Sequence, residues 1–428
     1  VSTMNSGYQA IYSGGAGTVS TMNSGWQTIS DGGKGTVSTM NGGQQFISSG
    51  GEGTVSTMNG GNQDISDGGT GTVSTMNSGW QSISIGGEGT VITMSGGSQY
   101  ISSGGIGTVS TMNGNGGVQH ISSGGTGTIS TMSGGGWQNI ASGGTGTIIS
   151  VALGGTQYVS SGGTGIIGTL DRNLVQDISG GEGTISTMNG GQQYISGGIG
   201  TVITMNGANQ YVWSGGTGTV STMLAGHQTI MKTGSGIIGI MEAGNQIIDG
   251  VGIVSVMNSG YQEVKSNGSA VVSTMNNGLQ RLSSGGGGTI STMNGGTQRI
   301  FDNATGGIVS VMNNGWQVIF GDTIGIISTM SSGTQDITRL GGTGIINTMD
   351  AGIQRISEGI GTVSTMSGGT QEVLRGGTSL DTTIYGGTQI VKSAGSALNT
   401  TLDGGTAIMT NSGAIVSCLL YTSPSPRD

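Results

Sequence analysis

Residues 17–34, GTVSTMNSGWQTISDGGK, decide the fold, because close copies of this stretch recur along almost the whole chain. Counted by the slot of Met22, the repeat occurs 23 times, and 14 of the 22 intervals between successive slots are 18 residues long. A short fixed period is typical of a solenoid, in which each copy buries its apolar face against its neighbours. We therefore expect a long rod that presents ladders of identical side chains.

Three columns of the repeat are apolar. They are the Met22 slot, the Val or Ile slot three residues before it (Val19), and the slot two residues after a Gln (Ile29). Short β-branched stretches broken by Gly-Gly pairs indicate strands and turns. The high glycine content also opposes helix, because each interior glycine costs about 1 kcal/mol.

Side chains alternate between the two faces of a strand, so Gln27 and Ile29 should point inward and Thr28 outward. Val19 and Met22 are three residues apart and both apolar, which predicts a bend or bulge between them. The sequence thus predicts an all-β fold: a single right-handed parallel β-solenoid (β-helix) of about 23 coils, with ~18 residues per coil and a coil spacing of ~4.8 Å.

A glutamine column is the strictest polar feature of the repeat, and it is kept in 22 of 23 copies until Ala407 breaks it. Stacked primary amides can hydrogen-bond one another along the axis of a β-stack. We interpret the column as an internal structural ladder, with a polar recognition stripe as the alternative. Its first members are Gln9, Gln27, Gln45, Gln63, Gln81 and Gln99.

The slot before the glutamine is aromatic in several copies. Such side chains are candidate surface contacts for a sugar or a protein partner, and the alternative is that each ring covers a corner between coils. The candidates are Tyr8, Trp26, Trp80, Trp137 and Trp316.

Hydroxyl columns such as Thr18 and Ser20 raise the alternative of an ice-binding face. The Thr column becomes apolar later in the chain, at positions such as Ile237 and Ile308, so partial burial explains it better.

Composition and motifs indicate no catalytic or metal site. The only histidines, His120 and His227, lie six coils apart, and Cys418 is the only cysteine. No Ser-His-Asp set, calcium-binding nonapeptide or phosphate loop is present. We therefore expect no enzyme, no cofactor and no metal.

The chain has 428 residues, of which 95 are glycine and 7% are charged, and its net charge is −9. Without a basic patch, nucleic acid is not an expected partner. No apolar run is long enough for a transmembrane helix, so we expect no direct membrane insertion of this segment. Val1 lies inside a repeat, which suggests a fragment or a processed segment.

The last repeats read GGTSLDTTIYGGTQIV at 376–391 and GSALNTTLDGGTA at 395–407. They closely resemble the repeat of AIDA-type autotransporter adhesins of Gram-negative bacteria. The earlier copies resemble a divergent version that keeps the Gly-Gly pairs and the glutamine. We accordingly divide the chain into 1–376, divergent repeats; 377–417, the coils closest to the AIDA-type repeat; and 418–428, a non-repeat tail that looks like vector or adapter read-through.

The resemblance implies a surface-exposed passenger domain, at the bacterial cell surface or secreted, attached to the outer membrane through a C-terminal barrel that this chain lacks. Its implied function is cell adhesion, self-association or biofilm formation, with a host-cell glycan, a host protein or another copy of itself as partner. It also implies O-linked heptose on Ser and Thr residues such as Ser30, Ser48 or Thr28. The alternatives are a structural stalk that displays another domain and an ice-binding solenoid.

Overall fold

A computed structural model describes residues 1–114, 116–171, 173–410, 415–417 and 420–421. Within these residues every regular element is a β-strand, and the fold is a parallel β-solenoid of about 22 turns, roughly 18 residues apart. The predictions of an all-β class and a parallel solenoid are confirmed. The chain divides into two compact units, Val1–Thr219 and Val220–Asp428.

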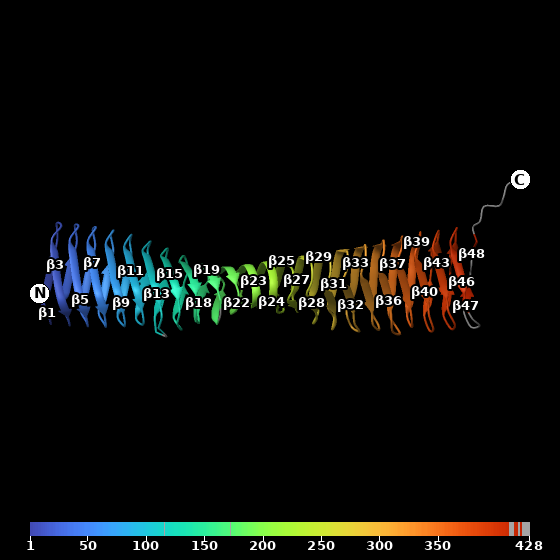
Figure 1. Ribbon diagram of the computed structural model, residues 1–428, viewed down its shortest axis with the longest axis horizontal. Coiled ribbons are helices and arrows are strands. Elements are labelled where there is room, and N and C mark those ends of the chain that lie inside the picture. Colours follow the sequence, from blue (N-terminus) through green and yellow to red (C-terminus); the bar gives the residue numbers. More distant parts are fainter. Residues whose placement is uncertain (115, 172, 411–414, 418–419, 422–428) are drawn as a thin grey trace. The chain divides into compact units, whose positions relative to one another are not determined.

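Each coil of the first unit contributes one long and one short strand, and the long strands lie side by side in chain order (Figure 1). The long strands are β3 (Ala16–Met22), β5 (Lys34–Met40), β7 (Glu52–Met58), β9 (Thr70–Met76), β11 (Glu88–Met94), β13 (Ile106–Met112), β15 (Thr126–Met132), β17 (Thr145–Val151), β19 (Thr164–Leu170) and β21 (Glu182–Met188), and the two-residue β1 (Thr3–Met4) pairs with the end of β3. The short strands are β2 (Tyr8–Ile11), β4 (Trp26–Ile29), β6 (Gln44–Ile47), β8 (Asn62–Ile65), β10 (Trp80–Ile83), β12 (Ser98–Ile101), β14 (Val118–Ile121), β16 (Trp137–Ile140), β18 (Gly155–Ser160), β20 (Leu174–Ser179) and β22 (Gln192–Ser196), and β23 (Ile199–Val212) joins a long and a short strand.

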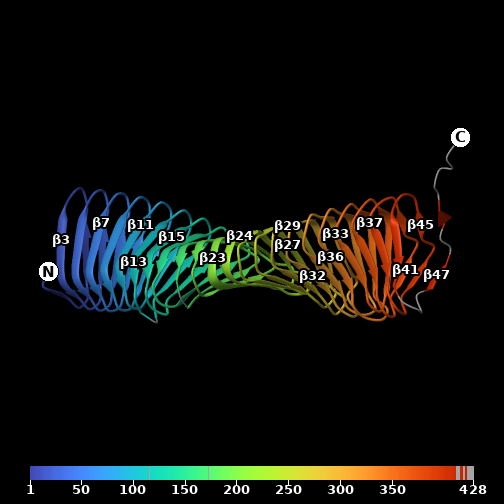
Figure 2. The ribbon, with the colours of Figure 1, turned by 45° about the vertical axis from the view of Figure 1, so that its right-hand side comes forward.

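The second unit repeats this plan, and Figure 2 shows its coils in a turned view. Its long strands are β25 (Ser235–Met241), β27 (Val251–Met257), β29 (Ser269–Met275), β31 (Gly287–Met293), β33 (Gly306–Met312), β35 (Ile324–Met330), β37 (Thr343–Met349) and β39 (Ile360–Met366), and β24 (Thr217–Ile230) ends in a short strand. Its short strands are β26 (Asn245–Ile248), β28 (Tyr261–Val264), β30 (Leu279–Leu282), β32 (Thr297–Ile300), β34 (Trp316–Ile319), β36 (Thr334–Ile337), β38 (Ile353–Ile356) and β40 (Thr370–Val373).

The last coils of the second unit have a different strand pattern, because the long strand is split in two. They comprise β41 (Thr378–Leu380), β42 (Thr383–Ile384), β43 (Thr388–Val391), β44 (Ser396–Leu398), β45 (Thr401–Leu402), β46 (Thr406–Met409), β47 (Ile415–Ser417) and β48 (Leu420–Tyr421). Most of the predicted tail, 418–428, lies outside the described residues. Its two described residues form β48, which pairs in parallel with β45.

Equivalent residues of successive coils pair directly. Val19 lies opposite Val37, and Met22 opposite Met40. The same in-register pairing joins Gln27 to Gln45 in the short strands. Identical side chains therefore stack at the coil spacing, which is about 4.8 Å in a β-sheet.

The alternation of buried and exposed residues in each coil follows the sequence pattern. In β5, Val37 and Met40 are fully buried, whereas Ser38 between them is exposed and Thr39 is half-buried. Two successive outward residues break the two-residue period of a regular strand, so the predicted bend between these columns is confirmed. Most short strands keep the alternation, with the Gln and Ile slots inside, as in β6.

The core is continuous along each unit. Its Val or Ile column, its Met column and its Ile column are almost entirely inaccessible to solvent, as in Val55, Met58 and Ile65. Each coil from β3 to β40 buries three apolar side chains against the equivalent three in its neighbours. The interior is therefore a set of ladders without a central hub, as expected for a solenoid.

Glycine corners separate the long strand from the short strand. Gly43 has a φ of 81°, a left-handed conformation that costs little only for glycine. A Cβ atom at this position would lie 2.7 Å from the carbonyl oxygen of Gly25 in the preceding coil. The corner glycines are thus required both by backbone conformation and by the close stacking of coils.

Candidate functional site

The predicted glutamine ladder lies inside each unit. Gln27 Nε2 donates to Gln9 Oε1 at 2.7 Å, and Gln45 Nε2 donates to Gln27 Oε1 at the same distance. The chain of amide–amide bonds continues without a gap through Gln63, Gln81 and Gln99 to Gln210 in the first unit, and from Gln389 back to Gln228 in the second. All members after Gln9 are fully buried. These side chains therefore bond one another and do not face an external partner.

A column of glycines faces the ladder and explains its tight packing. A Cβ at Gly35 would lie 2.2 Å from Ile29 Cδ1 and 2.7 Å from Gln27 Oε1. Real Cβ atoms do not approach other heavy atoms this closely, so any larger residue must displace the core. The glycine therefore makes room for both the isoleucine and the amide of the same coil.

The aromatic candidates lie on the outside, in the slot before the buried glutamine. Their exposed fractions range from 44% to 60%. The members are Tyr8, Trp26, Trp80 and Trp137 in the first unit and Trp316 in the second. Trp316 Nε1 donates to Asp336 Oδ2 at 2.8 Å, whereas the hydroxyls of Tyr8 and Tyr12 lie 3.1 Å apart. The rings are thus accessible, but they belong to different local environments.

The next outward slot of the short strand varies freely, as predicted for Thr28 and its equivalents. Tyr100 is 44% exposed, and its ring stacks on that of His120 with 4.8 Å between centroids. Asn139 Nδ2 lies 3.4 Å from His120 Nδ1. Burial lowers the pKa of His120 below its usual range, because the charged imidazolium loses solvation.

In the second unit the same outward slot carries charges. Arg355 lies between two carboxylates, 3.7 Å from Asp336 and 3.2 Å from Glu372. Burial raises the pKa of Asp336, and the hydrogen bond from Trp316 and the charge of Arg355 oppose that rise. Surface ion pairs of this kind contribute about 0–1 kcal/mol each.

The hydroxyl columns differ in exposure. Thr36 and Thr54 are half-buried, which confirms the partial burial predicted for the Thr column. Ser30, Ser48 and Thr28, the residues named for heptose, are also half-buried. More accessible hydroxyls are those of Ser38 and Ser56, which belong to the Ser20 column that the sequence analysis considered for an ice-binding face and not for heptose. These serines are exposed because their slot lies on the outer side of the bend between the Val and Met columns.

Asparagines form a further ladder that the sequence analysis missed. Asn23 Nδ2 donates to Asn5 Oδ1 at 2.8 Å, and Asn41, Asn59 and Asn77 continue the series on the exposed corner after the Met column. The recurrence of Asn at a fixed slot was the available signal. These bonds tie neighbouring corners together.

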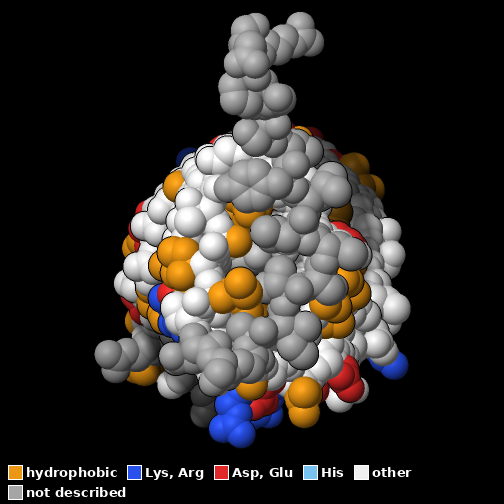
Figure 3. Space-filling model, turned by 90° about the vertical axis from the view of Figure 1, so that its right-hand side faces the viewer, with side chains coloured by type: hydrophobic (Ala, Val, Ile, Leu, Met, Phe, Trp, Pro, Cys, Tyr) orange, Lys and Arg blue, Asp and Glu red, His pale blue; other side chains and the backbone are white. Residues whose placement is uncertain are grey.

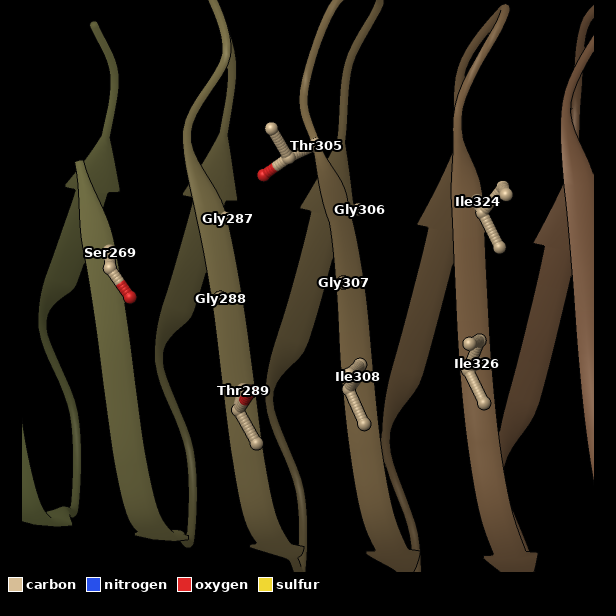
Figure 4. A pocket seen from close by; sticks show the side chains of 10 residues that line it. All are labelled: Ser269, Gly287, Gly288, Thr289, Thr305, Gly306, Gly307, Ile308, Ile324 and Ile326. Carbon is tan, nitrogen blue, oxygen red and sulfur yellow. The ribbon is translucent and has the colours of Figure 1, made fainter. Parts of the chain in front are cut away.

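A shallow hollow of about 340 Å³ lies on the outer face of β29, β31, β33 and β35. Figure 4 shows Thr289, Ile308 and Ile326 in line on successive strands, while Gly287 and Gly306 leave the strand face bare. The hollow belongs to the second unit.

Figure 3 shows that uncharged polar side chains and backbone cover most of the described surface seen from one end, with charged groups in small clusters.

Among the residues that the structure describes, no group of three or more His, Cys, Asp or Glu side chains is placed to hold a metal ion. His120 contacts Tyr100 and Asn139, and His227 Nδ1 lies 3.1 Å from Asn245 Nδ2. The same residues include no helix of the length and hydropathy needed to cross a membrane.

No family model matches the chain, and no curated protein sequence matches it. Among solved structures it is similar to the TibC-catalysed hyper-glycosylated TibA55-350 fragment. The two share 20% sequence identity, with 97% of this chain and 98% of that chain covered and a TM-score of 0.26. This TM-score is too low to establish a shared fold, so the fold assignment rests on the strand registers described above.

Proposed function

We propose that this chain is the solenoid passenger of a surface-exposed bacterial adhesin, which mediates cell adhesion, self-association or biofilm formation. The partner is a glycan or protein of a host cell, or another copy of the chain on a neighbouring cell. The proposal follows from the resemblance of residues 376–407 to the AIDA-type repeat and from the distribution of variable residues in the coils.

The observation that carries the proposal is the contrast between inward and outward slots. The interior is almost invariant, with a buried Gln and Ile in coil after coil, as in Gln45 and Ile47. The outward slot between them varies from Phe46 to Asp64 and Tyr100. A constant scaffold with a variable exterior suits a protein whose contacts are spread over many coils.

The Ser and Thr columns support a second part of the proposal, namely O-linked heptose on exposed hydroxyls. We expect Ser38 and Ser56 to be better acceptors than Ser30 or Ser48, because they are more exposed. Mass spectrometry of the chain isolated from its native host would test this order. Heptose confined to the half-buried column would contradict it.

Adhesion is tested with beads coated with the full chain and offered to epithelial cells and to one another. Beads that carry an unrelated β-solenoid at equal density are the control for non-specific adhesion. Specific binding to cells or between beads supports the proposal. Absence of binding in both assays, with chain carrying native glycosylation as well as without it, would favour a stalk that displays another domain.

A further inference from the structure

One corner of the first unit forms a groove lined by one aromatic ring, side-chain amides, hydroxyls and glycine backbone. It has a volume of about 580 Å³ and runs across the first coils beside Trp26. Three side chains of the aromatic slot follow one another there, because Trp26 pairs with Gln44, and Gln44 pairs with Asn62. An indole and two amides thus rise from one line at the coil spacing of about 4.8 Å.

The floor of the groove is backbone. Gly25 and Gly43 have positive φ, and a Cβ on either would lie within 2.7 Å of the carbonyl oxygen of the preceding corner. These two corner positions therefore have no room for a side chain of their own. A ligand in the groove would lie on glycine backbone beside Trp26 and Gln44, whereas only a small part of Asn62 is exposed.

The walls combine one aromatic face with neutral hydrogen-bonding groups. Trp26 is 53% exposed, whereas Asn62 is 9% exposed and Gln44 is half-buried. Ser6 and Ser24 add hydroxyls on the far side of the glycine corner. Each amide offers both donors and acceptors, so together these groups can match vicinal hydroxyls of a ligand.

The groove contains no charged lining residue. The nearest carboxylate along the strand is Asp64, whose side chain is hydrogen-bonded to that of Asn62, which helps to fix the orientation of the amide. An anionic or cationic ligand would find no counter-charge in the lining. An apolar helix or strand would leave the amide of Gln44 without a hydrogen-bond partner.

We propose that this groove binds a neutral oligosaccharide, with Trp26 stacked on the apolar face of one pyranose ring and Gln44 and Asn62 hydrogen-bonded to hydroxyls of the sugars that follow it. The coil spacing is close to the repeat of an extended pyranose chain, so adjacent sugars meet adjacent side chains. Trp80 follows Asn62 in the next coil and is 46% exposed, which places a second aromatic ring at the end of the row. This inference rests on the proposed adhesive function, since it assigns a ligand class to the same exterior.

The test is binding of the full chain to an array that carries neutral and charged oligosaccharides, followed by titration of the best neutral binder. We expect saturable binding of neutral glycans, and we expect Trp26→Ala and Gln44→Leu each to weaken it about tenfold. Trp137→Ala is the matched control. Trp137 is 44% exposed in the same slot, but its neighbours in the column are Val118 and Thr156, which form no amide pair.

Absence of neutral glycan binding, or equal losses in Trp26→Ala and Trp137→Ala, would overturn the inference. A preference for charged glycans would also overturn it. Cell adhesion measured on the same variants separates the two proposals. Glycan binding at Trp26 without cell adhesion would support the groove and contradict the adhesin. Cell adhesion that survives both the removal of cell glycans and Trp26→Ala would support the adhesin and contradict the groove. It would also indicate a protein partner.

Discussion

The row of buried amides has different hydrogen-bond partners in the coils up to β40 and in the coils from β41 to β46. In many of the earlier coils the second N–H of the glutamine lies near a glycine carbonyl, as Gln317 Nε2 lies 3.3 Å from the oxygen of Gly307. In the later coils side-chain hydroxyls take over. Ser379 Oγ donates to Gln371 Oε1 at 2.9 Å, and Gln389 Nε2 donates to Ser379 Oγ at 3.0 Å.

The change of partners accompanies a shift in which residue points inward. Val363 is fully buried in β39, whereas Asp381, which occupies the equivalent slot three residues before Ile384, is exposed with a φ of 50°. The next residue, Thr382, is fully buried instead and lies 3.4 Å from Gln371 Oε1. A left-handed residue splits the long strand and exchanges an apolar ladder for a polar one.

The glycine column changes at the same place and shows a steric rule. Ser379 and Ala397 occupy the slot that is glycine elsewhere, and in both coils the residue six positions earlier is Val instead of Ile. Ala270, an isolated case in the earlier coils, likewise follows Val264. Valine lacks the Cδ1 atom that comes closest to the glycine. In these three coils a Cβ coincides with the absence of this methyl group, although at Gly165 and Gly218, which also follow Val, a Cβ would meet the valine Cγ2 at 2.5 and 2.4 Å.

The largest expected difference between the two regions concerns loss of one glutamine. Gln317→Ala removes the donor to Gln298 Oε1 and the acceptor of Gln335 Nε2, and it leaves a cavity. We expect the local free energy of opening to fall by about 3–5 kcal/mol, measured by native-state hydrogen exchange over β34. Gln389→Ala should cost about half as much, because Ser379 and Thr382 continue to donate to Gln371 Oε1.

Ala407 is a natural precedent for the smaller loss. It replaces a glutamine, and Thr400 Oγ1 donates to Gln389 Oε1 at 3.2 Å instead. The hydrogen exchange of each variant is compared with that of the same coil in the wild-type chain. Differences in local stability between the two coils then cancel. Equal losses at both positions would mean that the hydroxyls do not support the later ladder.

The steric rule is tested next with Gly35→Ala. The new Cβ meets Ile29 Cδ1 and Gln27 Oε1, so we expect a loss of about 2–3 kcal/mol in local stability by hydrogen exchange. Ile29→Val alone should cost about 1 kcal/mol. The double variant should be more stable than the sum of the two losses by about 1 kcal/mol, since it reproduces the pairing of Val391 with Ala397. Strict additivity would show that the coincidence of Val with a larger residue has no steric cause.

A pair of isosteric exchanges in opposite directions gives a smaller effect. Val309→Thr places a hydroxyl among apolar side chains and should cost about 1–3 kcal/mol. Thr382→Val removes hydroxyl contacts to Ser379 and Gln371, where other donors remain, and should cost about 1 kcal/mol. Hydrogen exchange over β33 and β42 provides the measurement. A larger loss for Thr382→Val would indicate that its hydroxyl is the main support of Gln371.

Much of this architecture could be predicted from the sequence because the period repeats so often. The inward columns of Val19, Met22 and Ile29 and the bend between the first two follow from spacing alone. The inward turn of Thr382 could not be predicted from its column, since the same slot faces outward elsewhere. The signal was Asp381, and Asn399 in the next coil, because Asp and Asn adopt left-handed conformations most readily after glycine.

The candidate site could be predicted only in part. Outward placement of Trp26 follows from strand alternation, and the in-register neighbours Gln44 and Asn62 follow from the repeat. The groove itself depends on how far the glycine corners leave the floor open, which requires three-dimensional stacking of coils. The spacing of residues along the sequence does not reveal how far the glycine corners leave the floor open.

The smallest expected effect is a pH dependence confined to the earlier coils. Burial lowers the pKa of His120 in the folded chain, so between the ordinary pKa of about 6.5 and the lower folded value the unfolded state binds more protons. Local stability around β14 should therefore fall as the pH decreases through this range, and the fall should level off below the folded pKa. Hydrogen exchange between pH 7.5 and about 5.5, corrected for intrinsic exchange rates, measures it.

His120→Gln should flatten the profile, and residues 376–410, which contain no histidine, should show none of this component. Because His120 is only partly buried and stacks on an exposed tyrosine, solvent screening keeps the effect below those of the core variants. A profile unchanged in His120→Gln would rule out His120 as its source, and a rise of stability as the pH falls would point to Asp64 instead. The pKa of Asp64 is raised by burial, so protonation of its carboxyl stabilises the fold as the pH falls, which is the opposite sign.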